Sequence, residues 1–209
     1  MRKTQALILM VLLFNCLLNP VVVRAEGSDT QDLQIAMVAP ENTQNTDAYY
    51  TMNEEEWEWA CKIVLAEAGN QDFMGKVLVL NCSINNAKEL GISLMEEFTM
   101  DGRYSSVKNG NVYLMYTSED GKYVEEIVTS DMITDEIKQA VATACTKDFT
   151  EELLKEAADK QGCTDEQYYV GGARFFYNPD AISKEREAER NNITLSFSYG
   201  DHVFYRVWD

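Results

Sequence analysis

The chain has 209 residues and carries 35 acidic against 18 basic side chains, which gives a formal net charge of −17 at pH 7. A surface this acidic repels nucleic acid and anionic lipid headgroups, so neither is expected as a partner. The chain has one histidine, His202, which makes a histidine-rich zinc site untenable, and no metal or other cofactor is expected.

The first 25 residues have the features of a secretory signal. Arg2 and Lys3 precede an apolar run through Leu18, and the tripeptide Val23-Arg24-Ala25 offers small residues at the spacing that a signal peptidase accepts. We therefore predict a signal peptide over residues 1–25 and a secreted protein. An uncleaved membrane anchor is the alternative, although the run is short for a membrane span. No later segment is long and apolar enough to cross a bilayer.

Behind the signal, the composition predicts a linker and one domain. Residues 26–52 are polar with little periodicity, which indicates a linker of low order. Residues 53–209 remain, enough for one domain with one good core. Four cysteines lie in this domain, and in an oxidising compartment they permit two disulfides in any of three pairings: Cys61, Cys82, Cys145 and Cys163.

The first part of the domain is predicted to be helical. Asn53 followed by Glu56 is a capping box, and Gly69 ends the helix that it opens. Asp72 can cap a second helix over 73–87, which is apolar nearly all round and should therefore run through the core. Ser93 and Glu96 form the capping box of a short third helix over 93–98.

The second part mixes hairpins with helices. A loop over 99–111 leads to two β-prone runs, 112–116 and 122–128, which predict a hairpin. Thr134 is expected to cap a helix that ends near Cys145, and Thr150 to cap another that Gly162 stops.

The last part of the chain changes period. An extended aromatic segment (171–179) precedes a charged helix or loop (180–190). Residues 193–208 alternate apolar and polar around Gly200-Asp201, which predicts a second hairpin. The whole pattern indicates an α+β fold, with a helical body and a small antiparallel sheet from the C-terminal half.

One glutamate stands out in the first helix. Glu67 falls at the margin of the apolar stripe, beside Ala60, Ile63, Val64 and Ala68. Such surroundings disfavour the ionised carboxylate and raise its pKa towards the range of a general acid. A partly exposed glutamate at a helix end is the alternative that this pattern leaves open.

Other catalytic patterns are weaker. Cys61 lies mid-helix on the buried face, where a thiol is inert or disulfide-bonded rather than nucleophilic. No GxSxG elbow for a serine nucleophile is present. Aromatic residues that would suit the faces of sugar rings, and that a core explains equally well, gather in the second half: Tyr104, Phe175, Phe176, Tyr177, Tyr199, Phe204, Tyr205 and Trp208.

Four short segments, in this order, resemble motifs of the SleB/CwlJ-type cell-wall hydrolases, the spore cortex-lytic enzymes. The family's Ala-Glu-Ala-x-Gly-Glu block, with the helix behind it, is similar to LAEAGNQDFMGKVLVLNCSINN (65–86), and its Gln-Phe-Ser-Pro loop to GRYSSVKNG (102–110). Its aromatic Tyr-Asn-Pro segment resembles GGARFFYNPDAI (171–182), and its Gly-His-x-Phe-Tyr ending resembles GDHVFY (200–205). The resemblance covers about residues 57–209.

The resemblance implies a lysozyme-like α+β domain over 53–209 that cuts the glycan strands of peptidoglycan, with Glu67 as the essential acid. It implies a partner, the peptidoglycan of the cell wall or spore cortex, and a site of action outside the cytoplasm. No peptidoglycan-binding repeat precedes the domain, so an accessory protein is expected to supply targeting. The resemblance also places further residues around the substrate: Tyr104, Ser105, Tyr177, Asn178, His202 and Tyr205.

The chain departs from the family at Gln71, where many members carry a second glutamate. Asn86 likewise stands where the family has an arginine. Gln71 can hydrogen-bond a sugar but cannot take a proton, whereas hydrolysis by two carboxylates needs a second acid. A lytic transglycosylase needs only one, because the muramoyl C6 hydroxyl of the substrate attacks. We therefore hypothesise a one-acid transglycosylase that cleaves the bond between muramic acid and glucosamine.

Three alternatives stay open at this point. Asp72 or Asp101 could act as the second acid of a muramidase. The protein could bind glycan without cutting it, which the Gln71 substitution suggests. An amidase that cuts the peptide stem is the third, although that chemistry usually recruits zinc or a thiolate.

Overall fold

A computed structural model of the chain describes residues 48–162, 171–181 and 195–206. The predicted signal, most of the predicted linker, Cys163 and most of the charged segment 180–190 lie outside these ranges. All the described residues belong to one unit, 44–209. Within them, no helix combines the length and the apolar character that a membrane span requires.

Helix α2 (Glu54–Ala68) begins and ends where the sequence predicts. The Asn53 side chain accepts a hydrogen bond from the backbone N–H of Glu56, and the Glu56 carboxylate accepts one from the backbone N–H of Asn53. Gly69 follows the last helical residue, and its N–H donates to the carbonyl of Leu65. The helix therefore presents its last turn, with Glu67, beside the turn that leads to the next helix.

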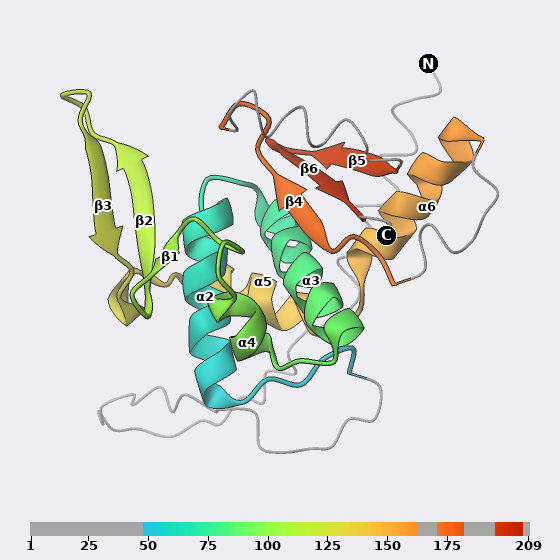
Figure 1. Ribbon diagram of the computed structural model, residues 1–209, viewed down its shortest axis with the longest axis horizontal. Helices are drawn as coiled ribbons and strands as arrows, with labels where there is room; N and C mark the ends of the chain where they lie inside the picture. The colour runs from blue at the N-terminus through green and yellow to red at the C-terminus, as the bar shows by residue number, and fades with distance from the viewer. Residues whose placement is uncertain (1–47, 163–170, 182–194, 207–209) are drawn as a thin grey trace, which may run out of the picture. The chain divides into compact units, whose positions relative to one another are not determined.

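Helix α3 (Phe73–Leu90) is the central element, as its apolar pattern predicts. Asp72 caps it, and every residue from Gly75 to Ala87 is buried. Its neighbours are α2, α4 (Leu94–Thr99), α5 (Asp135–Ala144), α6 (Phe149–Gln161) and strand β4 (Phe175–Tyr177) (Figure 1). The capping box of Ser93 and Glu96 at the start of α4 is confirmed.

The apolar core forms two clusters that share α3. One joins α3 to α2, α4 and α5 and includes Ile63, Leu80 and Phe98. The other joins α3 to α6 and the C-terminal strands and includes Leu78 and Phe204. Because α3 contributes to both clusters, it sets the separation between the helical body and the C-terminal sheet.

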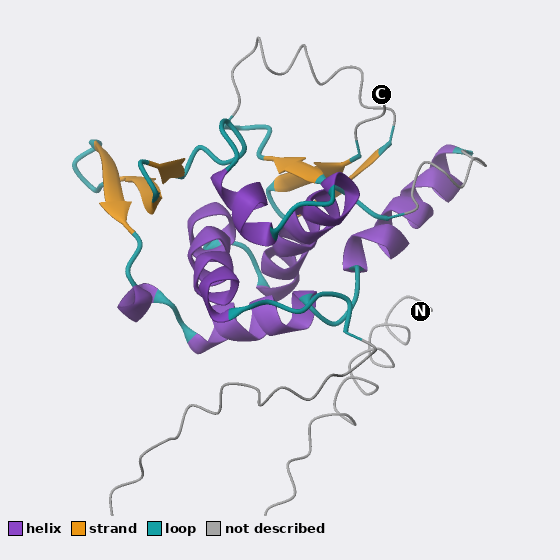
Figure 2. Cartoon of the chain, turned by 60° about the horizontal axis from the view of Figure 1, so that its bottom comes forward, coloured by secondary structure: helices purple, strands orange, loops and turns teal. Residues whose placement is uncertain are grey.

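The strands form two separate three-stranded antiparallel sheets. The first has the order β1-β2-β3 and contains β1 (Val107–Lys108), β2 (Asn111–Thr117) and β3 (Tyr123–Ile127); a short 3₁₀ helix (Ser130–Met132) follows. The second has the order β4-β6-β5, with β5 (Ser196–Tyr199) and β6 (His202–Tyr205). Figure 2 shows the sheets at different positions around the helices. The α+β prediction and both predicted hairpins are confirmed, while β1 was not predicted.

The start of α6 differs from the prediction by two residues. Asp148, not Thr150, is the capping residue, because its carboxylate accepts hydrogen bonds from both the backbone N–H and the hydroxyl of Thr150. The Thr150 hydroxyl oxygen in turn accepts a hydrogen bond from the backbone N–H of Ala173. The pair therefore joins α6 to the segment before β4, a long-range contact that local capping rules cannot reveal.

The ordered domain also begins earlier than residue 53. Tyr49 donates a hydrogen bond from its hydroxyl to Asn85, and Lys88 lies over the Tyr49 ring, 3.6 Å from its centre. The N–H of Tyr50 donates to the carbonyl of Cys145 at 3.2 Å. The end of the predicted linker is thus part of the packed domain, because two aromatic rings provide contacts that its polar composition concealed.

The two disulfides that the cysteine count permitted are not formed. Cys61, Cys82 and Cys145 all carry free thiols. Cys61 on α2 and Cys82 on α3 pack in different core clusters, each as a small apolar side chain. An even cysteine count was therefore a poor guide here, because it takes no account of which side of a helix each thiol occupies.

Gly172 provides a test of the contact between α6 and the C-terminal segment. Its φ of +66° lies in the left-handed region, and a β-carbon there would overlap the Asp148 carboxylate and the Thr150 hydroxyl. Gly162 has a similar φ of +71° with open space around it. We expect Gly172→Ala to cost about 1–3 kcal/mol of unfolding free energy beyond the loss in Gly162→Ala, since only Gly172→Ala adds overpacking to the backbone penalty. Urea denaturation followed by circular dichroism measures both, and equal losses would contradict the packing described here.

Candidate active site

Glu67 lies in the last turn of α2 with its carboxylate turned towards the loop that precedes β1. It is partly buried, and the hydroxyl of Ser106 donates a hydrogen bond to its Oε1. Burial raises the pKa of Glu67, while hydrogen bonds from the hydroxyl and backbone N–H of Ser106 and the charge of Arg103 oppose that shift. The carboxyl is thus held in one place, in surroundings that favour its protonated form.

The loop between α4 and β1 supplies the hydrogen-bond partner of Glu67, and this partner is Ser106, the neighbour of the Ser105 that the resemblance places near the substrate. Ser105 is exposed, whereas Ser106 is buried and bonds the carboxylate. The Ser106 carbonyl also accepts a hydrogen bond from the N–H of Tyr113 at 2.8 Å. Ser106 therefore connects the acid to strand β2 of the first sheet.

Tyr104 forms the buried wall of the same loop. Its hydroxyl lies 2.6 Å from that of Ser83 on α3, and its ring packs against Phe98 and Phe176. Burial, the largest influence, raises the pKa of this phenol, so it stays neutral. The charge of Glu67 also raises the pKa of Tyr104. Tyr104 thus serves as a packing residue and a hydrogen-bonding group near Glu67.

His202 joins this group from strand β6 of the second sheet. Its ring meets Phe176 edge to face, with centroids 5.3 Å apart, so a row of rings runs from Tyr104 through Phe176 to His202. Burial lowers the pKa of His202, opposed by the charge of Asp201, so the ring is neutral at pH 7. Its buried Nδ1 has no hydrogen-bond partner among the described residues.

The other residues expected on the C-terminal sheet pack among themselves. Tyr205 stacks on Phe175, and Tyr177 meets Tyr205 edge to face. The Asn178 side-chain oxygen accepts a hydrogen bond from the backbone N–H of Asp180 at 2.9 Å, which stabilises the turn after β4. Tyr177 and Tyr205 lie on the face of this sheet opposite to that of His202, because successive residues of a strand point to opposite faces.

Gln71 has a structural role that the sequence did not indicate. Its side-chain oxygen accepts from the backbone N–H of Asp201 at 3.0 Å, and its amide nitrogen donates to the Asp201 carboxylate at 2.9 Å and to Asn70 at 3.1 Å. Both donors of the amide are therefore in use. The side chain fastens the turn of the second hairpin, which carries His202, to the junction of α2 and α3. A β-carbon at Gly200 would collide with this amide.

The carboxylates considered as a second acid are placed differently from Glu67. Asp72 accepts from the N–H of Gly75 as the cap of α3, and its other oxygen accepts from the Tyr199 hydroxyl at 3.1 Å. Asp101 is exposed in the loop after α4. The groups that shift the pKa of Glu67 are Ser106 and Arg103, and no carboxylate of the described ranges is among them.

The described thiols are unsuited to nucleophilic catalysis. Burial raises the pKa of Cys61 to about 12 and that of Cys145 to about 11, and it raises the pKa of Cys82 as well. A thiol with such a pKa is almost entirely protonated at neutral pH, and the thiolate is the reactive form. In the described ranges, no group of three or more His, Cys, Asp or Glu side chains could hold a metal ion.

Arg103 is a site residue that the sequence analysis missed. It lies in a loop rich in turn-forming residues, where an arginine is most often a solvated charge. Instead its side chain is 9% exposed and pairs with Glu97, whose side chain is 0% exposed. The available signal was a basic residue flanked by aromatic and small residues in the segment GRYSS. That signal does not indicate burial, which becomes evident only when the partner, Glu97, is known.

Comparisons with known proteins give one structural likeness. No protein-family model matches the chain, and no curated protein matches it. Among solved structures, the chain is similar to the catalytic domain of SleB, a germination-specific lytic transglycosylase from Bacillus anthracis. The TM-score is 0.48 at 16% sequence identity, over 74% of this chain and 97% of that one. At this level the likeness alone carries no weight for activity, which has to be inferred from the residues of the site.

We expect Ser106→Ala to raise the pKa of Glu67, because the hydrogen bond from Ser106 stabilises the ionised carboxylate. Titration of the Glu67 side-chain carboxyl by carbon-13 NMR measures the pKa directly. Ser105→Ala is the matched control, since it removes the neighbouring hydroxyl from an exposed position. A pKa unchanged in Ser106→Ala, or raised equally in Ser105→Ala, would show that the hydrogen bond has been misassigned.

Proposed function

We propose that the protein is a peptidoglycan-lytic enzyme in which Glu67 alone acts as acid and then as base on the glycan strand. The observation that supports this proposal is a single carboxyl that burial favours in the protonated form required of a general acid, and that accepts a hydrogen bond from Ser106. The ordered motifs of the sequence point to the same residue. Asp72, one of the two candidate second acids, is engaged as the cap of α3 and as the acceptor of the Tyr199 hydroxyl, which favours a mechanism with one acid.

The proposed reaction has two proton transfers. Protonated Glu67 donates its proton to the oxygen that links muramic acid C1 to glucosamine, and the bond between C1 and this oxygen breaks. The C6 hydroxyl of the same muramoyl residue then forms a new bond to C1, and its proton passes to the Glu67 carboxylate. The products are an anhydromuramoyl end and a glucosamine end, and Glu67 returns to its starting form without a water molecule.

The remaining expected residues are proposed as substrate contacts. His202 is proposed because its ring continues the row formed by Tyr104 and Phe176, next to the loop that carries Ser106. Tyr104 is proposed to shape the wall beside Glu67, and exposed Ser105 to meet the glycan at the surface. Tyr177, Asn178 and Tyr205 are proposed as separate contacts at the other face of the C-terminal sheet and the turn after β4. Gln71 supports this surface by holding the turn at Asp201.

The setting of the activity is proposed from the sequence. A signal over residues 1–25 would export the protein, and glycan strands of the cell wall or spore cortex would be its substrate. The high negative charge is compatible with an uncharged sugar backbone as ligand and disfavours nucleic acid. An accessory protein that recruits the enzyme to its substrate belongs to the same proposal.

A muramidase is the competing activity, because exposed Asp101 lies in the loop that carries Ser106. It would add water rather than the C6 hydroxyl and leave reducing ends. Mass spectrometry of digested peptidoglycan distinguishes the two, since an anhydromuramoyl end is lighter than a reducing end by one water. Reducing ends alone would replace the transglycosylase by a hydrolase.

We expect Glu67→Gln to lower the rate of glycan cleavage by at least about 100-fold, because glutamine cannot transfer a proton. The variant should remain folded, since its side-chain oxygen can still accept from Ser106. Turbidity loss of purified sacculi, with product analysis, measures the activity. Glu58→Gln is the control on the exposed face of the same helix. Full activity in Glu67→Gln would refute the site assignment.

The same variant should gain stability at neutral pH. The pKa of Glu67 is higher in the folded than in the unfolded chain, so the unfolded chain loses its proton first as the pH rises. The wild type therefore loses unfolding free energy through the interval between the two pKa values, and Glu67→Gln does not. Denaturant melts at acidic and neutral pH should show that the advantage of the variant grows with pH, and a constant difference would contradict the raised pKa.

A further inference from the structure

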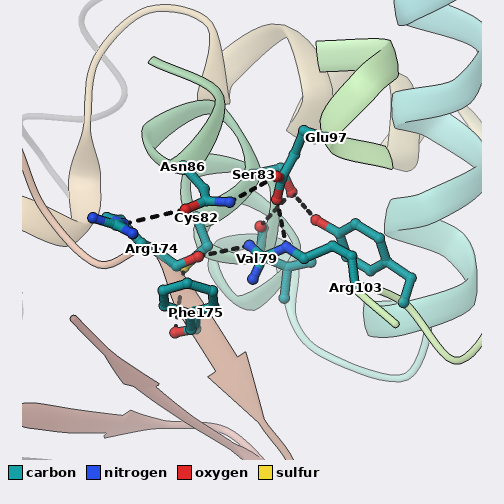
Figure 3. Close-up of polar contacts among 9 residues, drawn as sticks. Val79, Cys82, Ser83, Asn86, Glu97, Arg103, Arg174 and Phe175 are labelled. Carbon is teal, nitrogen blue, oxygen red and sulfur yellow. Dashed lines mark hydrogen bonds and ion pairs between the residues drawn. The ribbon is translucent and has the colours of Figure 1, made fainter. Parts of the chain in front are cut away.

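Arg103 occupies the centre of a buried polar network that joins four parts of the chain (Figure 3). Its Nε donates to one oxygen of Glu97 on α4, and its Nη2 donates to the backbone carbonyl of Arg174 at 2.6 Å. The other Glu97 oxygen accepts from Asn86 on α3 at 2.7 Å, and the Asn86 side-chain oxygen accepts from Arg174 at 3.2 Å. The loop before β1 is thereby tied to α3, α4 and the start of β4.

The contacts around the guanidinium use its flat shape. Its centre lies 4.5 Å from the centre of the Phe175 ring and 5.4 Å from that of Tyr104. One edge meets the Glu97 carboxylate while another reaches the Arg174 carbonyl. A lysine ammonium is a point charge without the planar fork that holds both partners here.

The buried ion pair of Arg103 and Glu97 is not explained by its contribution to stability alone. Removing two charges from water is costly, and apolar side chains of similar volume often stabilise such a site as well or better. What the pair provides instead is a fixed geometry, because each partner is held by further directed hydrogen bonds. The structure that it fixes is the loop that carries Ser106, three residues beyond Arg103, to the Glu67 carboxylate.

We propose that Arg103 is a positioning residue of the active site: clamped by Glu97 and by the backbone of Arg174, just before β4, it holds the loop in the one conformation that sets Ser106 against Glu67. The inference rests on the proposed function of Glu67. In the reaction, the Ser106 hydroxyl would orient the protonated acid. It would then donate a hydrogen bond to the Glu67 carboxylate that forms when the proton leaves. The charged and titratable groups that face Arg103 are Glu97 from α4, Tyr104 from its own loop and Cys82 from α3, and Arg103 itself faces Glu67.

Two variants that preserve every charge test the clamp. Arg103→Lys keeps the cation but loses the planar fork, and Glu97→Asp keeps the anion but withdraws it by one methylene. If one of them fails to fold by circular dichroism, the other still decides the question. Lys108→Met is the matched control, because Lys108 lies two residues after Ser106 but forms an exposed ion pair with Glu125.

The expected result on soluble glycan strands is a fall in kcat of about 10-fold to 100-fold with KM changed by less than about 2-fold, since misplacement affects the chemical step more than binding. Lys108→Met should match the wild type. Adding Ser106→Ala to Arg103→Lys should lower kcat little further, because both changes remove the same contact. A folded Arg103→Lys with wild-type kcat, or full additivity with Ser106→Ala, would overturn the proposal.

A second measurement keeps this test separate from that of the proposed function. In the absence of substrate, carbon-13 NMR should show a higher pKa for Glu67 in Arg103→Lys and Glu97→Asp than in the wild type, because the hydrogen bond from Ser106 is lost. This result is expected even if the protein proves not to cut glycan. A Glu67 pKa unchanged in both folded variants would refute the positioning role, whatever the substrate.

Discussion

The rest of the structure depends on the burial of α3 on every side. A helix buried all round must satisfy any polar side chain it carries, since an unmade buried hydrogen bond costs about 1–3 kcal/mol. Three asparagines meet this demand by bonding other elements. Asn81 bonds the backbone between α5 and α6, Asn85 bonds the start of α6 and the segment before β4, and Asn86 bonds Glu97 on α4. Polar groups in the core thus specify where its neighbours lie.

The surroundings of Glu67 combine burial with directed hydrogen bonds on one carboxyl. Its position at the end of α2 places it where apolar packing and the loop before β1 meet. Burial alone would leave the carboxyl protonated and poorly oriented, while strong hydrogen bonds alone would leave it ionised. The combination of burial with Ser106 and the charge of Arg103 leaves a carboxyl that is oriented yet still disposed to hold a proton. Such opposed influences on a single carboxyl are typical of a group that both donates and accepts a proton.

The features that local chemistry dictates were predicted well. Capping side chains marked the starts of α2, α3 and α4, and the all-round apolar pattern marked α3 as central. The features that failed depend on distant partners. Thr150 was expected to cap α6, whereas Asp148 is the cap and accepts from Thr150, and the hydrogen bonds between Gln71 and Asp201 were not foreseen. The sequence does not indicate which of Ser105 and Ser106 bonds Glu67, because this depends on which side of the loop faces the carboxylate.

By itself, the amino-acid sequence determined the helices, both hairpins and the α+β class, because caps, turns and hydrophobic period act over a few residues. The choice of Glu67 as the candidate acid rested instead on the resemblance of the four ordered motifs. Only the tertiary structure decided that Ser106 bonds this acid, that Arg103 is buried against Glu97, and that the thiols of Cys61, Cys82 and Cys145 stay free. The physical reason is that hydrogen bonds, ion pairs and burial depend on side chains that meet across the fold. The distance between two residues along the sequence does not indicate whether their side chains come into contact in the fold.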